Sequence, residues 1–234
     1  IDLSWQPLTG TSIDLTFNPD YAQIEADPFN VNLSQYSVYL SERRPFFLRG
    51  SEMFNLSRGH GLNFGYGPYD LFYSRNIGKI VEDSLMVPIR AGVKVTTRGE
   101  GMEGGLLYSN TGGAGNELPA HYMVGRFVKQ INSNVDGGFF YGGKYNEDKN
   151  IHIASVDGTV NFGDNKLFYQ YAVTDSAAVS DYAGYFEWKR LTKHFVNDVS
   201  LHYTGKDFSA SQIGYMSMKG YDATAALVPI FYGD

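Results

Sequence analysis

The stretch MVPIRAGVKVT, residues 86–96, alternates apolar and polar residues. Its alternate positions are Val87, Ile89, Ala91, Val93 and Val95, with Arg90, Lys94 and Thr96 between them. Successive side chains of a β-strand point to opposite faces of a sheet. The stretch therefore predicts an amphipathic strand, with the five apolar residues on one face and the polar residues on the other.

The same alternation recurs along the chain, most clearly at residues 166–174, 182–189 and 197–206. Turn-forming residues separate these stretches, at residues 98–101, 132–134, 146–150 and 163–165. Longer connections are expected at residues 112–119 and 175–181. We expect about thirteen strands, the first two at Ile1–Leu8 and Ile13–Asn18 and the last at Asp222–Phe231. Short turns that alternate with longer loops are typical of outer-membrane barrels.

The composition excludes several classes of protein. The 234 residues include 18 Tyr, 16 Phe and 27 Gly, no Cys, and carry a net charge of -6. A disulfide framework is excluded, and without a basic stripe nucleic acid is not an expected partner. No apolar run reaches the length of a transmembrane helix, whereas a barrel strand needs only about 9–11 residues. Because Ile1 to Trp5 show no signal-peptide pattern, we expect a processed or truncated chain.

Two kinds of all-β fold fit this alternation. A soluble sandwich or lipocalin-like barrel would turn the apolar faces inward, and a membrane barrel would turn them outward. The aromatic apolar faces and the charged opposite faces favour the membrane barrel. We therefore expect one all-β domain over residues 1–234, an antiparallel transmembrane β-barrel. Its strands form an incomplete set of about 12–14, part of a longer chain.

The alternation stops between Pro19 and Pro68. A connection of this length in a compact domain is usually functional or disordered. Several apolar side chains in it need burial: Phe29, Phe46, Phe47, Leu48 and Phe54. We therefore expect residues 19–68 to pack inside the barrel as an irregular luminal plug, with a short helix at Leu33–Leu40.

Four motifs in the first hundred residues carry a resemblance to a known family. They are TFNPDYAQIEAD at 16–27, ERRPFFL at 42–48, YSRNIG at 73–78 and VPIRAGVKVT at 87–96. Together they resemble the opening of an uncharacterised outer-membrane β-barrel domain of Bacteroidota, which usually follows a carbohydrate-binding family 9-like domain and is sometimes described as a membrane-associated hydrolase. The resemblance implies an outer-membrane barrel and further parts on both sides of this chain.

Charged residues of the expected plug suggest two kinds of site. Asp20, Glu25 and Asp27 could supply oxygen ligands to calcium, although their spacing is not a calcium-loop motif. The alternative is that these carboxylates pair with the plug's arginines. Glu42 with Arg43, Arg44, Arg49 and Arg58 would then form luminal ion pairs or a charged constriction. No nucleophile motif and no histidine metal motif is present, and no cofactor other than the possible calcium is expected.

The expected function is a partly plugged pore or a membrane anchor in the outer membrane of a Gram-negative bacterium. Its partners would be membrane lipid, an oligosaccharide or other small solute, and other envelope proteins. One alternative is a membrane-associated hydrolase that uses luminal carboxylates such as Glu25 and Asp27. The other is a soluble all-β binding module.

Overall fold

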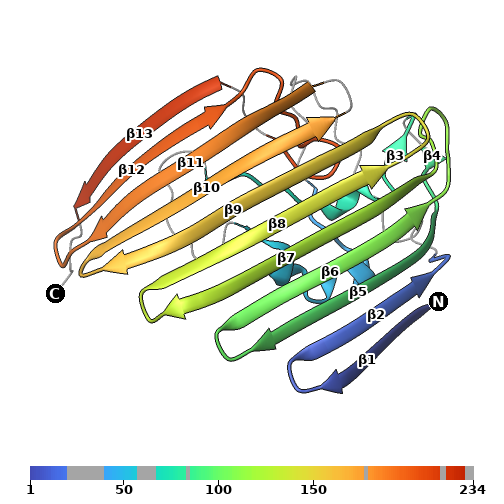
Figure 1. The fold of residues 1–234 in the computed structure, drawn as a ribbon, viewed down its shortest axis with the longest axis horizontal. Coiled ribbons are helices and arrows are strands. Elements are labelled where there is room, and N and C mark those ends of the chain that lie inside the picture. The colour runs from blue at the N-terminus through green and yellow to red at the C-terminus, as the bar shows by residue number, and fades with distance from the viewer. Residues whose placement is uncertain (20–39, 57–66, 83–84, 177–178, 217–219, 230–234) are drawn as a thin grey trace.

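The computed structural model describes residues 1–19, 40–56, 67–82, 85–176, 179–216 and 220–229. These residues form β-strands joined by turns and loops, with one short α-helix and two 3₁₀ segments (Figure 1). The strands are β1 (Asp2–Leu8), β2 (Thr11–Phe17), β3 (Ile80–Val81), β4 (Leu85–Met86), β5 (Ile89–Gly99), β6 (Met102–Thr111), β7 (Ala120–Asn132), β8 (Val135–Tyr145), β9 (Asn150–Phe162), β10 (Asn165–Ser176), β11 (Val179–Leu191), β12 (Phe195–Thr204) and β13 (Gly220–Pro229). The helical segments are α1 (Pro45–Leu48), η1 (Ser51–Phe54) and η2 (Ser74–Asn76).

One curved antiparallel sheet dominates the structure. It has 11 strands in the order β1-β2-β5-β6-β7-β8-β9-β10-β11-β12-β13, and β3 and β4 form a separate two-stranded sheet. The expected all-β antiparallel fold is confirmed. Within the described residues the sheet is open, since β1 and β13 lie at its two edges and do not pair. The closed barrel that the sequence favoured is therefore not observed.

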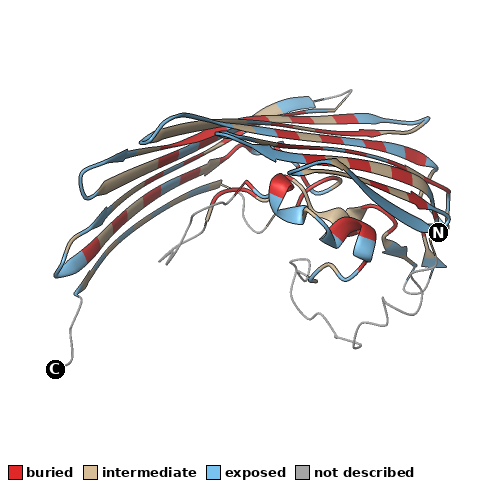
Figure 2. Ribbon diagram, turned by 90° about the horizontal axis from the view of Figure 1, so that it is seen from below, coloured by how far each residue is buried: buried red, intermediate tan, exposed pale blue. Residues whose placement is uncertain are grey.

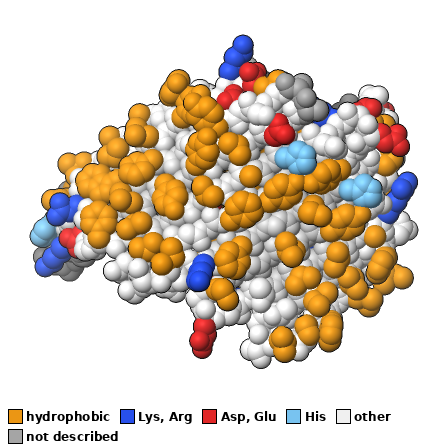
Figure 3. All heavy atoms as spheres, viewed as in Figure 1, with side chains coloured by type: hydrophobic (Ala, Val, Ile, Leu, Met, Phe, Trp, Pro, Cys, Tyr) orange, Lys and Arg blue, Asp and Glu red, His pale blue; other side chains and the backbone are white. Residues whose placement is uncertain are grey.

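The two faces of the sheet differ sharply in chemistry. Figure 2 shows buried and exposed residues alternating along the strands. The convex face carries exposed apolar side chains such as Leu106, Phe127 and Leu201, whereas many side chains of the concave face are polar and buried. Figure 3 looks onto the convex face, where hydrophobic side chains predominate. The predicted separation of an apolar face from a polar face is confirmed.

A bulge at the start of β5 changes which faces the side chains of residues 86–96 occupy. The pairing of β5 with β6 shifts register between Ile89 and Ala91. Ile89 therefore lies on the concave face and is buried, together with Val87, while Val93 and Val95 lie on the convex face. The prediction that all five apolar residues share one face is wrong, because an extra residue in a strand reverses the alternation beyond it.

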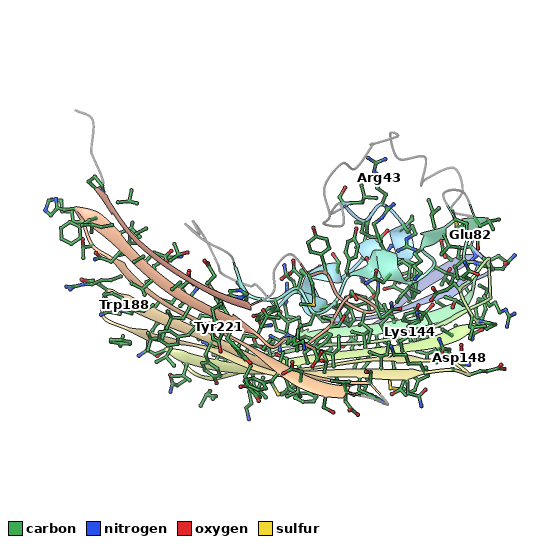
Figure 4. All side chains as sticks on the ribbon, turned by 90° about the horizontal axis from the view of Figure 1, so that it is seen from above. Arg43, Glu82, Lys144, Asp148, Trp188 and Tyr221 are labelled. Atoms are coloured by element: carbon green, nitrogen blue, oxygen red, sulfur yellow. The ribbon has the colours of Figure 1, made fainter. Side chains whose placement is uncertain are left out.

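The connection between β2 and β5, residues 18–88, is called the insert below. Its described part holds α1, η1, η2 and the β3–β4 pair, and it packs in the hollow of the sheet (Figures 2 and 4). Phe46, Phe47 and Phe54 are buried there as predicted. The prediction that Leu48 is buried is wrong, because Leu48 is 46% exposed at the end of the short helix. Phe29 lies outside the described residues, and so does the expected helix at Leu33–Leu40 except for Leu40.

Most of the predicted turns lie where the sequence placed them, and the loop at residues 112–119 is present between β6 and β7. The predicted long connection at residues 175–181 is wrong, because β10 runs to Ser176 and β11 begins at Val179. Asp175 pairs with Ser180 across the two strands, and the Ser180 hydroxyl donates to the Asp175 carboxylate at 2.5 Å. This side-chain hydrogen bond extends the hairpin into a stretch whose polar sequence resembles a loop.

Candidate functional site: the polar concave face and its insert

Lys94 joins the insert to the concave face of the sheet, which is called the wall below. Its strand, β5, turns it toward the concave side, and only 1% of its surface is exposed. Its ammonium donates hydrogen bonds to the carbonyls of Phe46 and Arg49, at the C-terminal end of α1. Carbonyls at a helix end lack intrahelical partners and attract cations. Lys94 therefore fixes the insert by satisfying them.

Asp14 completes this arrangement from the neighbouring strand β2. Its Oδ2 lies 3.6 Å from Lys94 Nζ, and its Oδ1 lies 3.5 Å from Arg49 Nη1. Gly92 leaves the space for the insert on this wall, because a Cβ there would lie 2.9 Å from Cζ of Phe46. The wall is thus shaped to take one aromatic ring and one helix end.

Arg44 holds the insert together from within. It is 1% exposed, and it contacts Glu42 through Nε at 2.9 Å and Nη2 at 2.7 Å. The same guanidinium donates to the carbonyls of Ile77 at 2.6 Å and Ser74 at 2.9 Å, and it lies 4.3 Å from the ring centre of Phe47. A planar fork with this many partners connects segments that are 30 residues apart in the chain.

Burial by itself would raise the pKa of Glu42, but hydrogen bonds from Arg44, the charge of Arg44 and a hydrogen bond from Ser74 outweigh it, and the pKa lies below the ordinary value of 4.5. The Ser74 hydroxyl donates to Glu42 at 2.6 Å. Glu42 therefore stays ionised in the folded protein under mildly acidic conditions.

A second charged cluster lies among the longer loops. Glu117, in the loop between β6 and β7, contacts Lys79 of the insert at 2.6 Å and Lys144 of β8 at 2.5 Å. Lys144 also donates to Gln212, in the connection between β12 and β13, at 2.7 Å. Burial raises the pKa of Glu117, but the two lysines outweigh that effect and bring the pKa below its ordinary value. The Glu117 carboxylate thereby joins three separate segments, and Lys144 links a fourth through Gln212.

The side chain of Gln170 on β10 binds the backbone of the insert at Tyr69. Its side-chain oxygen accepts from the Tyr69 N–H at 2.7 Å, and its amide nitrogen donates to the Tyr69 carbonyl at 3.2 Å. The Tyr69 hydroxyl reaches the Tyr203 carbonyl at 2.7 Å, and burial raises the pKa of Tyr69 to about 12. Burial also raises the pKa of the neighbouring Asp70 carboxyl. The insert thus contacts the wall at Phe46 and Arg49 and again at Tyr69.

A mostly polar cavity of about 450 Å³ lies near the tight turns. Strands β5 to β10 and Leu56 of the insert line it. Arg126 and Asp157 are its buried ion pair, with Nη2 2.6 Å from Oδ2. Gly138 lies against the Arg126 guanidinium, and a side chain there would overlap it. Amide side chains such as Gln130 complete a lining suited to hydrogen bonding with a polar solute.

The residues predicted from sequence are placed as follows. Glu42 forms an ion pair with the buried Arg44, and Arg49 lies beside Asp14. Arg43 is exposed and points away from the sheet, on top of the insert (Figure 4). Arg58 and the possible calcium ligands Asp20, Glu25 and Asp27 lie outside the described residues, so the calcium hypothesis stays a prediction. The same holds for the hydrolase alternative, which relied on Glu25 and Asp27.

Sequence reasoning missed several residues of the site: Lys94, Gln170, Glu117 and the pair of Arg126 with Asp157. Glu117 lies in the loop between β6 and β7. The others are charged or amide residues on the polar face of a strand, and that face was expected to contact water. Within the described ranges, no group of three or more His, Asp or Glu side chains is placed to hold a metal ion. In the same ranges, none of the helices has the length and apolar character needed to cross a membrane.

Comparison with known proteins gives one family. Searches of curated proteins and of solved structures found no match. The matched segment, residues 9–98, covers β2, the insert and nearly all of β5, and thus both the Lys94 and the Arg44 arrangements. The chain carries at residues 9–98 a DUF5916 domain, a domain of unknown function.

Proposed function

We propose that this chain forms part of an outer-membrane β-barrel whose lumen is partly filled by the insert. The observation that carries the proposal is the polarity of the sheet. The face covered by protein holds buried charges such as Lys94, Arg126 and Lys144, while the uncovered face exposes large apolar side chains. A soluble protein would show the reverse, because exposed apolar area is costly in water. In a bilayer that arrangement is favourable.

The height of the apolar face supports the proposal. On β10 the convex side chains between Asn165 and Asp175 are Leu167, Tyr169, Tyr171 and Val173. Ten residues at about 3.3 Å each span roughly 33 Å along a strand, and a tilt of about 40° reduces this to a height of about 25 Å. That is the height of the apolar band of membrane barrels. Asn165 and Asp175 would then lie at its two boundaries.

The two edge strands of the sheet, β1 and β13, suggest that further strands complete the proposed barrel. β1 and β13 each pair on one side only within the described residues. Unpaired strand edges cannot lie in hydrocarbon, because no water is present there to bond them. We therefore propose that further strands close the sheet, in agreement with the incomplete strand set expected from the sequence.

The insert would act as a partial plug. The contacts of Lys94, Gln170 and Lys144 hold it against the wall, and the cavity beside Arg126 leaves polar space for a small solute. An oligosaccharide or another small polar solute fits such a lining of amide and charged groups, since these groups hydrogen-bond to hydroxyls. The protein would serve as a restricted passage or as a surface anchor for solute handling.

Two experiments test this function. A barrel needs detergent to stay in solution, and its mobility in gels changes on heating. A water-soluble monomer whose mobility does not respond to heat would overturn the proposal. In planar bilayers, deletion of residues 20–52 from the full-length protein should raise the conductance, and an unchanged conductance would exclude the insert as a plug.

A further inference from the structure

We propose that a row of Tyr, His and Asp side chains on the convex face binds the headgroup of a phospholipid that carries both a phosphate and an ammonium group. This inference rests on the membrane location proposed above. The row lies at the end of the strands where the longer loops emerge, and it crosses from β6 to β11. Its members are Tyr108, Asn110, His121, Tyr141, Tyr145, His152, Asp175 and Ser180.

Strand pairing makes the row continuous. Asn110 pairs with His121 across β6 and β7, and His121 pairs with Tyr145 on β8. On the other side of β9, His152 pairs with Asp175, which pairs with Ser180 on β11. Below the row the convex face is apolar, with Met123, Phe139 and Val156 exposed on the same strands. Histidine side chains are visible toward one end of this face in Figure 3.

His152 is held by two tyrosines. Tyr141 Oη lies 2.8 Å from His152 Nδ1 and 2.6 Å from Tyr145 Oη. The Tyr145 ring packs edge-on against the imidazole, with the ring centres 5.3 Å apart. Of the two neutral groups in the contact, the phenol is the stronger acid, and it is assigned as the donor to Nδ1. The neutral imidazole then carries its hydrogen on Nε2.

His121 repeats this arrangement on the neighbouring hairpin. Tyr108 Oη lies 2.7 Å from His121 Nδ1, so the same assignment leaves an Nε2–H donor on His121. Among the described residues, neither Nε2 atom has a hydrogen-bond partner. This assignment places two N–H donors on one polar row, at the boundary of the apolar face. A phosphate oxygen at the level of lipid headgroups is the acceptor that such donors fit.

Asp175 gives the row its selectivity among phospholipids. It is exposed, and it lies opposite His152 in the sheet, so the two side chains are close neighbours on the same face. A carboxylate beside the donors repels a headgroup that is only anionic, but it attracts one that also carries an ammonium. Phosphatidylethanolamine has both groups on adjacent parts of one headgroup. The geometry therefore points to this lipid class rather than to phosphatidylglycerol.

Long-range proton–nitrogen NMR spectra of the ¹⁵N-histidine-labelled protein in detergent micelles test the inference. We expect the Nε2–H tautomer for His121 and His152, and a shift of both signals on addition of short-chain phosphatidylethanolamine. The variant His152→Phe should weaken the apparent affinity about tenfold, the value of one hydrogen bond to a charged group. Asp175→Asn should remove the preference over phosphatidylglycerol and leave phosphate binding in place.

His194→Phe is the matched control, since His194 lies exposed in the turn between β11 and β12 and should leave lipid binding unchanged. Equal affinities of the parent and the His152→Phe variant would overturn the inference, as would an Nδ1–H tautomer at both sites. Inorganic phosphate that shifts both signals as strongly as the lipid would overturn the assignment to a headgroup. A protein that needs no detergent would instead contradict the proposed membrane function, so the two failures are distinguishable.

Discussion

Lys94 on β5 and Asp14 on β2 form a buried pair on the concave face, with Nζ 3.6 Å from Oδ2. Both residues are almost fully buried, at 1% and 2% exposure. Burial of a charge is favourable only when partners compensate it. Here the compensation comes jointly from Asp14 and the carbonyls at the end of α1, so that wall and insert depend on one another.

Replacing Lys94 by Met should destabilise the protein by about 3 kcal/mol, because Asp14 would lose its lysine partner in a buried site. Urea unfolding in detergent, followed by tryptophan fluorescence, measures this loss. Lys129→Met is the control, since Lys129 lies exposed on β7 and should change stability by less than about 0.5 kcal/mol. The double variant Lys94→Met, Asp14→Asn should recover part of the loss. A loss as large for Lys129→Met as for Lys94→Met would contradict the role of the pair.

Acidification should loosen the insert through Glu42. Because the folded pKa of Glu42 lies below its ordinary value of 4.5, the carboxylate contributes stability that is present above pH 4.5 and is lost as the pH falls through the folded pKa. Limited proteolysis of the insert between pH 7 and pH 3 follows this change. The variant Glu42→Gln should be cleaved faster at pH 7 and show less dependence on acid. Identical profiles for parent and variant would exclude Glu42 as the acid-sensitive contact.

Gly105 on β6 should not tolerate a side chain. A Cβ there would lie 2.7 Å from Cζ of Phe54, a buried ring of the insert. The variant Gly105→Ala should therefore lower stability by about 1–3 kcal/mol, the usual effect of overpacking. Gly99→Ala is the matched control, because no atom lies within 4 Å of a Cβ at Gly99. Equal unfolding midpoints for the two variants would mean that the insert does not pack on this part of the wall.

The sequence predicted the elements whose signal is local. A period of two residues defines the faces of β10, and small polar segments define the turns, so both could be read without a structure. The bulge at Ile89 could not, because one extra residue leaves no local mark in the sequence. The exposure of Leu48 depends on where the short helix α1 ends, which its apolar character did not reveal.

The site was harder to predict than the fold. Glu42 and Arg44 are two residues apart, and their pairing follows from the local sequence. Lys94 and Asp14 are 80 residues apart, and the polar face of each strand gave no sign that protein instead of water covers it. Contacts such as those of Gln170 with Tyr69 appear only when the insert is placed over the sheet.

Single-cysteine labelling tests whether the convex face lies in lipid. These 234 residues contain no Cys, so within them an introduced thiol is the only one to be labelled. Leu201→Cys and Tyr171→Cys lie in the apolar band, and Gln130→Cys lies on the concave side, in the lining of the polar cavity. In the full-length protein reconstituted in liposomes, we predict that a lipid-soluble spin label quenches a fluorophore at the first two sites and spares the third. Quenching of the Gln130 site with no effect at Leu201 and Tyr171 would contradict a lipid-facing convex surface.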